Sequence, residues 1–221
     1  MIVYIIMAII AYAIGSINFS VLISRKMAGF DVREKGSGNA GSTNVLRTVG
    51  KKAAALTLVC DILKGVVAVL ISLLISKMAK DCSPAILVEI AALAVVLGHT
   101  FPIFFEFRGG KGVATSLGLI LIINWKIGLI CLVFALILMA ITRMVSLGSI
   151  SAAVLFAVLT LFIRESYIVE YEASFIIFGI LLAAFVIFNH RSNLKRIIAG
   201  TENKLSFSKK EKENIKWKKL Q

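Results

Sequence analysis

The chain alternates long apolar runs with short polar segments. Five runs are recognisable as membrane-spanning helices, each of which needs about 20 apolar residues: Ile2–Ile23, Ala53–Ser76, Ala85–Phe107, Ile127–Thr142 and Ala173–Phe188. Two further runs, Val113–Ile123 and Ser149–Ile163, are too short at about 1.5 Å per residue to cross a core of about 30 Å unless each gains a turn. We predict an all-α, polytopic membrane helix bundle with seven transmembrane helices. The alternative is five spans, with residues 113–142 folded differently.

Composition supports a membrane protein. Apolar residues make up 59% of the 221 residues and charged residues 17%, with a mean hydropathy of +0.93. A soluble domain has about 45–50% apolar and about 25% charged residues. These values exclude a disordered chain, a fibre and a soluble nucleic-acid-binding protein, so the net charge of +13 needs another explanation.

The basic residues are distributed unevenly between the two sides of the predicted membrane. With seven spans, 20 of them fall on one side and four on the other, and residues 189–221 alone hold ten. Because cytoplasmic loops are enriched in Lys and Arg, this places the N-terminus outside and the C-terminus in the cytoplasm. We therefore expect one domain, residues 1–221, with a basic cytoplasmic tail over residues 194–221 that faces anionic lipid head groups.

The first polar segment that could carry chemistry covers residues 36–47, on the inner side. Three glycines within six residues allow backbone N–H groups to point together into a nest that binds anions. Arg47 can hold a phosphate with two parallel bonds, and its i, i+3 spacing places it on one helical face with Asn44. The alternative is a flexible loop that caps the next helix. The candidate phosphate-binding residues are Ser37, Gly38, Asn39, Gly41, Thr43, Asn44 and Arg47.

The second segment covers residues 98–112, also on the inner side. A Gly-Gly-Lys-Gly turn allows a ligand to approach the backbone closely and precedes a predicted helix, whose N-terminus attracts phosphate. The alternative is a tight turn with positive-inside charge, which we favour for Arg108 but not for Lys111. We predict that His99, at a helix end before Pro102, is structural and bonds a free carbonyl. The candidates are Gly109, Gly110, Lys111 and Gly112.

A third group is split along the chain. Ser146 lies in the short inner turn after Arg143, and His190 and Asn193 lie just past the last apolar run. If the helix continues, His190, Asn193 and Arg196 share one face at i, i+3 and i+6. Polar groups at head-group level need no special function, but their place beside two loops suited to phosphate leads us to include Ser146, His190 and Asn193 in the site.

Together these segments resemble the bacterial acyl-phosphate-dependent glycerol-3-phosphate acyltransferases, the PlsY family of integral membrane enzymes. The resemblance rests on residues 37–47, on 98–102 with 109–115, and on 146–148 with 190–193, in the order found in the family. Three positions differ from the common pattern: Ser42 stands where alanine is common, Arg108 where lysine is common, and Val145 where a serine often precedes Ser146.

The resemblance implies a reaction. The 1-hydroxyl of sn-glycerol 3-phosphate attacks the carbonyl of a long-chain acyl phosphate, which gives 1-acyl-glycerol 3-phosphate (lysophosphatidic acid) and phosphate, the first acylation in phospholipid synthesis. It implies catalytic roles for Ser37, His190 and Asn193. Because an acyl phosphate is an activated mixed anhydride, no metal, cofactor or acyl-enzyme is required, and positioning with charge neutralisation supplies most of the acceleration. Either His190 or the substrate's own phosphate could accept the proton.

The resemblance also implies partners and a location. We expect glycerol 3-phosphate, a long-chain acyl phosphate and membrane lipids as partners, and no nucleic acid. A monomer in the bacterial inner membrane, with its site on the cytoplasmic face, could receive acyl phosphate from a soluble enzyme that makes it. Small residues at Gly15, Ser16 and Gly65 would leave room for the acyl chain between helices.

Two other classes compete with this interpretation. A transporter of a phosphorylated solute would also be polytopic and basic inside, but its site would lie near the bilayer midplane between repeats, and we find no repeat. Asp61 and Lys64 within a span are better interpreted as an i, i+3 pair. An acyl-CoA-dependent acyltransferase of the soluble-headed type would carry a His-x-x-x-x-Asp motif, which the chain lacks.

Overall fold

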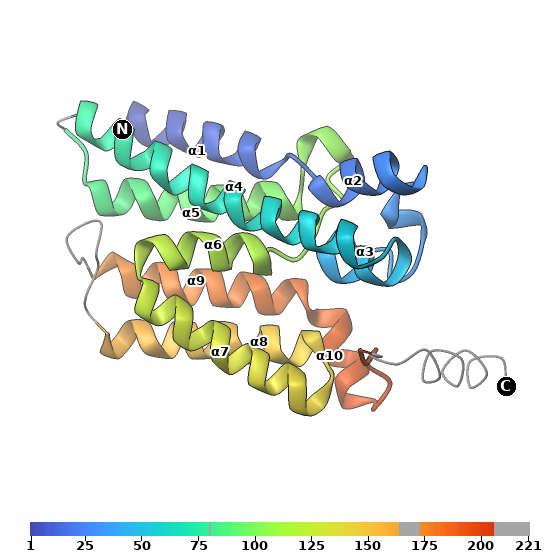
Figure 1. The fold of residues 1–221 in the computed structure, drawn as a ribbon. Helices are drawn as coiled ribbons and strands as arrows, with labels where there is room; N and C mark the ends of the chain where they lie inside the picture. The colour runs from blue at the N-terminus through green and yellow to red at the C-terminus, as the bar shows by residue number, and fades with distance from the viewer. Residues whose placement is uncertain (80, 164–172, 206–221) are drawn as a thin grey trace, which may run out of the picture.

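The structure is a computed structural model that describes residues 1–79, 81–163 and 173–205. These residues form α-helices and two 3₁₀ helices, which confirms the all-α prediction (Figure 1). The α-helices are α1 (Ile2–Gly15), α2 (Phe19–Ala28), α3 (Ser42–Thr48), α4 (Lys51–Met78), α5 (Pro84–Thr100), α6 (Val113–Ile123), α7 (Trp125–Thr142), α8 (Val145–Phe162), α9 (Ser174–Asn189) and α10 (Arg191–Ile198). The 3₁₀ helices are η1 (Val32–Glu34) and η2 (Ile103–Phe105).

The helices are long and apolar enough for a membrane protein. Within the described residues, five segments are long and apolar enough to cross a membrane: Ile2–Ala28, Lys51–Met78, Pro84–Phe105, Trp125–Thr142 and Val145–Phe162. A sixth, α9 with α10, is long and apolar enough if the two helices are counted as one span across their 63° bend. Helix α6 is apolar but has only 11 residues. All seven predicted runs are therefore helical, while their number as complete spans stays a prediction.

Three boundaries differ from the sequence prediction. The first run is broken at Ser16–Asn18, where the Asn18 side chain caps α2 by accepting from the Val21 N–H at 3.2 Å. The third run ends at Thr100 because Pro102 cannot continue a helix. The eighth helix begins at Val145, four residues before the predicted start, so its first turn contains the small residues that were predicted to form a turn. The predicted outer loop 164–172 and the tail beyond residue 205 lie outside the described residues.

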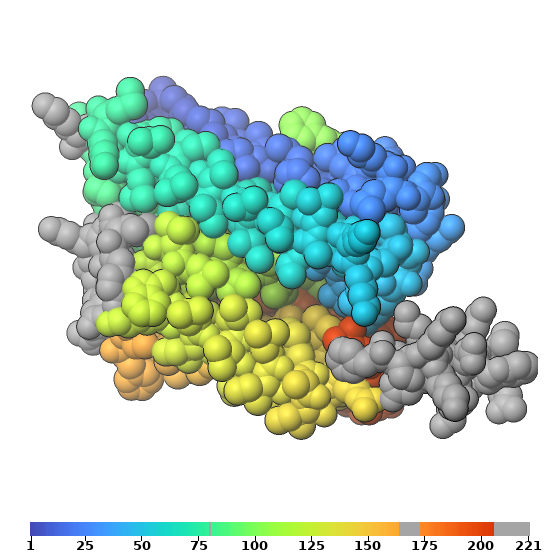
Figure 2. All heavy atoms as spheres, in the orientation of Figure 1, coloured from blue at the N-terminus to red at the C-terminus, as the bar shows by residue number. Residues whose placement is uncertain are grey.

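Helix α5 is the centre of the bundle. It contacts α1, α4, α6 and α9. Of the residues in its most apolar stretch, 67% are buried inside the protein, against 22–33% in the other four long segments. In contrast, α4 and α7 lie outermost on one face of the molecule (Figures 1 and 2). Their outward residues are large and apolar, among them Leu70, Leu74, Val133 and Ile137. Such a surface is suited to contact with lipid chains.

At the break between α1 and α2, two backbone carbonyls accept hydrogen bonds from a neighbouring helix. The Lys64 ammonium on α4 donates to the carbonyls of Gly15 and Ile17, at 3.0 Å each. Gly15 packs against the α5 backbone at Val95, and Gly65 packs against the α6 backbone at Thr115, so neither position has space even for a Cβ atom. The prediction that these small residues leave room for an acyl chain is therefore wrong, because neighbouring helices fill that room.

The two ends of the bundle differ in character. The N-terminus and residues 81–83 lie at one end, while α2, α3 and α10 lie at the other (Figure 1). The predicted site segments gather at the α2–α3–α10 end, together with most of the basic residues of the described chain. N-terminus and α10 lie at opposite ends, as an odd number of crossings requires.

We predict that this basic end faces the cytoplasm. In a chain whose native cysteines are replaced, a cysteine at Asp81 should react with a membrane-impermeant thiol reagent added outside intact cells. A cysteine at Lys51, at the basic end of α4, should react after permeabilisation alone. Labelling of the Lys51 position in intact cells, with protection of the Asp81 position, would mean that the orientation is reversed.

Candidate active site

Three segments that are far apart in sequence meet at the basic end of the bundle. The Ala40 N–H of the first segment donates to the Gly109 carbonyl of the second at 3.4 Å. The Lys111 ammonium of the second segment donates to the Asn193 side-chain oxygen of the third. The structure thus brings the three sequence motifs together at one end of the bundle, although each motif is built differently from the expectation.

In the first segment, Asn44 organises the loop. Its side-chain N–H groups donate to the carbonyls of Val32, Lys35 and Asn39 at 2.9–3.0 Å, and its oxygen accepts from the Ser37 N–H at 3.0 Å. Asn44 is 1% exposed. Its donors are therefore used to hold residues 32–39 together. The side chains of Ser37 and Arg47 are exposed at the same end and remain the groups that can reach a ligand.

The predicted nest is partly used within the protein. The N–H groups of Ser37, Gly38 and Ala40 bond to Asn44, Lys35 and Gly109, respectively. Gly41, at the N-cap of α3, accepts from the Asn44 and Val45 N–H groups. Of the other predicted residues, Asn39 lies in the loop before Gly41 and Thr43 lies in the first turn of α3. Anion binding here would therefore depend more on side chains than on the backbone.

In the second segment, the two adjacent glycines lie directly against the end of α5. The N–H groups of Gly109 and Gly110 donate to the carbonyls of Thr100 and His99 at 3.0 and 3.1 Å. A Cβ at Gly109 would collide with the His99 carbonyl, and one at Gly110 with the His99 ring and the Ala40 carbonyl. This packing explains the glycines without a ligand. It also places Lys111, just before the Gly112 cap of α6, at the point where the loop faces α10.

His99 is held from below by a buried ion pair. Its Nδ1 lies 3.5 Å from Asp61 Oδ1, and the Lys64 ammonium lies 3.1 Å from the same carboxylate oxygen. The predicted pair of Asp61 and Lys64 is therefore present. The structural role expected for His99 agrees with this geometry, but its partner is a carboxylate and not a free helix carbonyl.

The third group is built on three elements. Ser146 is the second residue of α8 and not part of a turn, because the small residues there serve helix packing: Gly148 lies against Ala135 and Met139 of α7. His190 stands at the bend between α9 and α10, so it does not share a continuous helix with Asn193 and Arg196. His190 is 3% exposed, and its Nδ1 lies 2.8 Å from the Val186 carbonyl. Since a carbonyl accepts, Nδ1 carries the proton and Nε2 is left as an acceptor.

A carboxylate that the sequence prediction missed lies at the centre of this group. Glu202 is 9% exposed and accepts from Ser146 Oγ, Asn193 Nδ2 and Arg196 Nε at 2.9, 2.8 and 2.9 Å. Burial by itself would raise the pKa of Glu202, but these hydrogen bonds outweigh it and lower the pKa below its ordinary value. The one available signal was an acidic residue inside a strongly basic tail.

Positive charge is concentrated around Glu202. Burial, more than any other cause, lowers the pKa of Lys111 to about 8; Arg196 lowers it further, Glu202 opposes this, and Arg47 has the smallest lowering effect. Lys111, Arg47 and Arg196 therefore lie within electrostatic reach of one another. His190 also lies within reach of Lys111 and Glu202. Three cations around one carboxylate leave an excess of positive charge, which suits an anionic ligand such as a phosphate ester.

These features define a class: a multi-pass membrane protein with a cationic site at one end, suited to phosphate groups. The family model for glycerol-3-phosphate acyltransferase matches residues 5–200. A glycerol-3-phosphate acyltransferase of Clostridioides difficile is 44% identical over 206 residues, which cover 93% of this chain and 97% of the relative. One of Thermoanaerobacter sp. is 46% identical over 198 residues, covering 90% and 93%. The chain therefore belongs to the glycerol-3-phosphate acyltransferase family, which confirms the resemblance to the PlsY enzymes.

Solved structures agree with the family assignment. The crystal structure of PlsY (YgiH), an integral membrane glycerol 3-phosphate acyltransferase, in its glycerol 3-phosphate form has a TM-score of 0.78 and 35% identity, covering 92% of this chain and 96% of that one. The lysophosphatidic acid form of the same enzyme has a TM-score of 0.76 and 33% identity. This chain is thus a membrane acyltransferase, and the comparisons give no support to the transporter interpretation.

We predict that Lys111 binds phosphate and does so less well at high pH. Removing one charged hydrogen bond costs about 1.5–3 kcal/mol, so Lys111→Ala should weaken inorganic phosphate binding roughly 10- to 100-fold in calorimetric titration of the purified chain. Because the pKa of Lys111 is lowered to about 8, its ammonium is lost as the pH rises above 8. Wild-type affinity should therefore fall between pH 8 and 10, although phosphate stays a dianion there.

Two variants provide the controls for Lys111. Lys111→Arg should keep its affinity up to pH 10, because a guanidinium stays charged. Arg108→Ala should change the affinity by less than about twofold, because that side chain is exposed to solvent. Equal losses in Arg108→Ala and Lys111→Ala, at equal folded yield, would contradict the assignment of Lys111.

Proposed function

We propose that this protein transfers a long-chain acyl group from an acyl phosphate to the 1-hydroxyl of sn-glycerol 3-phosphate. The hydroxyl oxygen bonds to the acyl carbon, the bond from that carbon to the phosphate oxygen breaks, and inorganic phosphate leaves. The products are 1-acyl-glycerol 3-phosphate and phosphate, and this is the first acylation step of phospholipid synthesis. Family membership gives glycerol 3-phosphate as the acceptor.

The observation that carries this proposal is the concentration of cations around Glu202. Arg47, Lys111 and Arg196 come from α3, the second loop and α10, and they outnumber the carboxylate that they surround. Two phosphate groups, one on each substrate, carry negative charge that more than offsets this excess. Charge neutralisation of the leaving phosphate in a partly buried site strongly favours its departure. An acyl phosphate donor therefore fits this site better than a thioester.

Most of the predicted site residues have a distinct part in the proposal, and Asn44 holds the loop that carries Ser37. Arg47 and Lys111 hold phosphate oxygens, and the exposed Ser37 hydroxyl lies at the same end to donate to one of them. Ser146 and Asn193 already donate to Glu202, which keeps them in place beside the ligand. Gly109 and Gly110 let the second loop approach α5 and the first loop, the positive φ of Gly38 and Gly112 suits glycine, and Gly41 packs against Asn39 of its own loop.

His190 is the group proposed to face the acceptor hydroxyl. The Nδ1–H bond to Val186 fixes the ring and leaves Nε2 free to accept the hydroxyl hydrogen. Nε2 could take the proton as a general base, or it could orient the hydroxyl while the departing phosphate takes the proton. Both versions place His190 beside Lys111 and Asn193, as the bend between α9 and α10 allows.

The membrane arrangement completes the proposal. We infer seven spans, with the N-terminus outside, the C-terminus in the cytoplasm and the site on the cytoplasmic face of the bacterial inner membrane. The enzyme would act as a monomer, with its acyl donor lying among the membrane lipids and supplied by a soluble enzyme that forms acyl phosphate. Water-soluble glycerol 3-phosphate would reach the site from the cytoplasm.

Donor choice is the decisive test of this function. Purified protein should form lysophosphatidic acid from glycerol 3-phosphate and palmitoyl phosphate, with one phosphate released for each product, as measured by mass spectrometry and phosphate assay. Palmitoyl-CoA should give no product under the same conditions. Product from the thioester alone, or from neither donor, would contradict the proposal, and Arg47→Ala serves as the inactive control.

We predict that substitutions of His190 distinguish the two proton acceptors. If His190 is the base, His190→Gln should lower kcat by about 10²–10⁴, as His190→Ala does, because an amide cannot accept a proton at neutral pH. If His190 orients the hydroxyl, His190→Gln should recover a large part of the rate, since its oxygen can accept the same hydrogen bond. Arg191→Ala, at the exposed neighbouring position, is the matched control. Wild-type kcat in His190→Gln would exclude general-base catalysis by this residue.

A further inference from the structure

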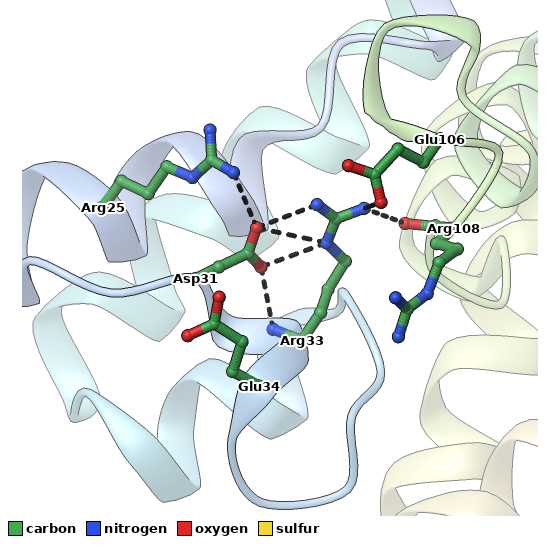
Figure 3. A pocket seen from close by; sticks show the side chains of 6 residues that line it. All are labelled: Arg25, Asp31, Arg33, Glu34, Glu106 and Arg108. Atoms are coloured by element: carbon green, nitrogen blue, oxygen red, sulfur yellow. Dashed lines mark hydrogen bonds and ion pairs between the residues drawn. The ribbon is translucent and has the colours of Figure 1, made fainter.

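A cluster of charged residues outside the site joins its two phosphate loops. It contains Arg25 on α2, Asp31 and Arg33 at the start of η1, and Glu106 and Arg108 in the loop that follows η2 (Figure 3). We propose that Arg33 is a positioning residue for the acyl transfer: it holds the first loop and the second loop in register, so that both can bind phosphate at once. This inference rests on the proposed function.

The Arg33 guanidinium bridges the two loops directly. On one side, its Nε and Nη2 donate to the Asp31 carboxylate at 2.9–3.2 Å. On the other side, its Nη1 donates to the Phe105 carbonyl at 2.7 Å and lies 3.5 Å from the Arg108 carbonyl. Its side chain is 8% exposed. Arg33 is thus a buried link between loops and presents little of itself to a substrate.

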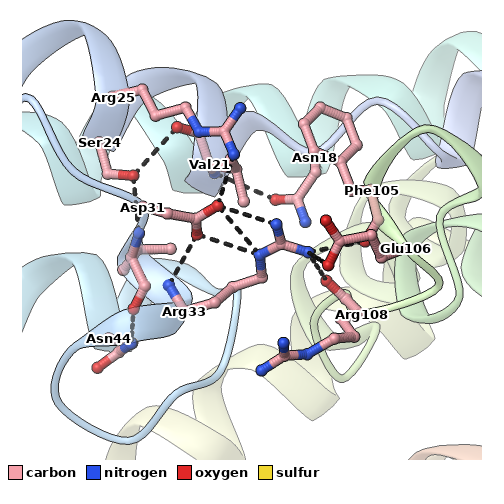
Figure 4. Close-up of polar contacts among 11 residues, drawn as sticks. Asn18, Val21, Ser24, Arg25, Asp31, Arg33, Asn44, Phe105, Glu106 and Arg108 are labelled. Carbon is pink, nitrogen blue, oxygen red and sulfur yellow. Dashed lines mark hydrogen bonds and ion pairs between the residues drawn. The ribbon is translucent and has the colours of Figure 1, made fainter.

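The first side of the link is continuous with the first phosphate loop. The Arg33 N–H donates to Asp31 Oδ1 at 2.9 Å, which fixes the backbone at the start of η1. The next contact along the chain is the Val32 carbonyl, which accepts from Asn44, while the Val32 N–H donates to Ser24 (Figure 4). Asn44 in turn holds residues 35–39. Movement of Arg33 is therefore coupled to the loop that carries Ser37.

The second side of the link spans a strained stretch of backbone. Glu106 and Phe107 both have positive φ, at 58° and 56°, a conformation that residues other than glycine rarely adopt. The two carbonyls that Arg33 contacts, those of Phe105 and Arg108, are the ones on either side of this pair. Such strain persists when neighbouring contacts hold it. Lys111 comes three residues after Arg108. The contacts of Arg33 with the Phe105 and Arg108 carbonyls therefore influence where Lys111 lies.

A lysine cannot replace the planar guanidinium in this role. Its single ammonium can reach Asp31 or the Phe105 carbonyl, but it lacks the fork that holds both in fixed directions. Arg25 provides the matched comparison, because it also donates to Asp31, at 2.9 Å, but it is 57% exposed and, within the described residues, makes no hydrogen bond or ion pair with the second loop. Both residues carry the same charge and contact the same carboxylate. The comparison therefore isolates the contact with the second loop, which Arg33 makes through the Phe105 carbonyl.

The test compares Arg33→Lys and Arg25→Lys in the purified full-length chain, with glycerol 3-phosphate and palmitoyl phosphate as substrates. We expect Arg33→Lys to raise the KM of at least one substrate about five- to tenfold while kcat falls less than about threefold, because binding geometry is lost and the reacting groups are kept. Arg25→Lys should leave both KM values within about twofold of wild type. Hydrogen exchange should also quicken in residues 103–111 of Arg33→Lys and stay unchanged in Arg25→Lys.

The outcomes separate this inference from the function on which it rests. A wild-type chain that makes no lysophosphatidic acid would overturn the proposed function. An active wild type with equal kinetics in the two lysine variants, or with wild-type kinetics in Arg33→Lys, would overturn the positioning role alone. A collapse of kcat with unchanged KM values would also overturn it, since that pattern indicates a direct part in the chemistry. Thermal unfolding of each variant confirms that folded protein is compared.

Discussion

Repulsion among like charges is the constraint on which this site depends. Arg47, Lys111 and Arg196 come from three separate parts of the chain. Their positive charges repel one another: burial lowers the pKa of Lys111, and this repulsion lowers it further. Glu202 draws them together, because its carboxylate is buried among hydrogen-bond donors and stays ionised. The net charge left over is positive, which suits the phosphate ligand of the proposed function.

The motif residues divide into those that hold the loops and those that meet the ligand. Asn44 uses its amide on three backbone carbonyls, and Gly109 with Gly110 allows two chain segments to touch. These residues are needed to hold the loop conformation, whether or not they contact a ligand. In the proposed function, longer cationic side chains such as Lys111 and Arg47 contact the phosphate. A motif of this kind therefore records a loop conformation as well as a binding site.

Much of the fold and part of the site could be predicted from the sequence. Apolar runs predict helices well because lipid forces each backbone polar group to bond within its own helix. Prediction failed where a distant group supplied the bond or filled the space, as Lys64 does at the first helix break and α6 does at Gly65. The roles of Glu202 and Arg33 depend on tertiary contacts 56 and 72 residues away, which no local pattern reveals.

The bond from Lys64 to the break between α1 and α2 has a consequence for the biogenesis of the protein. The carbonyls of Gly15 and Ile17 leave the ribosome 49 and 47 residues before the ammonium that satisfies them. An unsatisfied carbonyl in hydrocarbon costs several kcal/mol. The break between α1 and α2 must therefore stay near the water interface or inside the translocon until α4 lies beside it. We therefore expect insertion of this protein to be cooperative from its first helix, because a nascent chain halted before α4 leaves the carbonyls of Gly15 and Ile17 without the Lys64 ammonium.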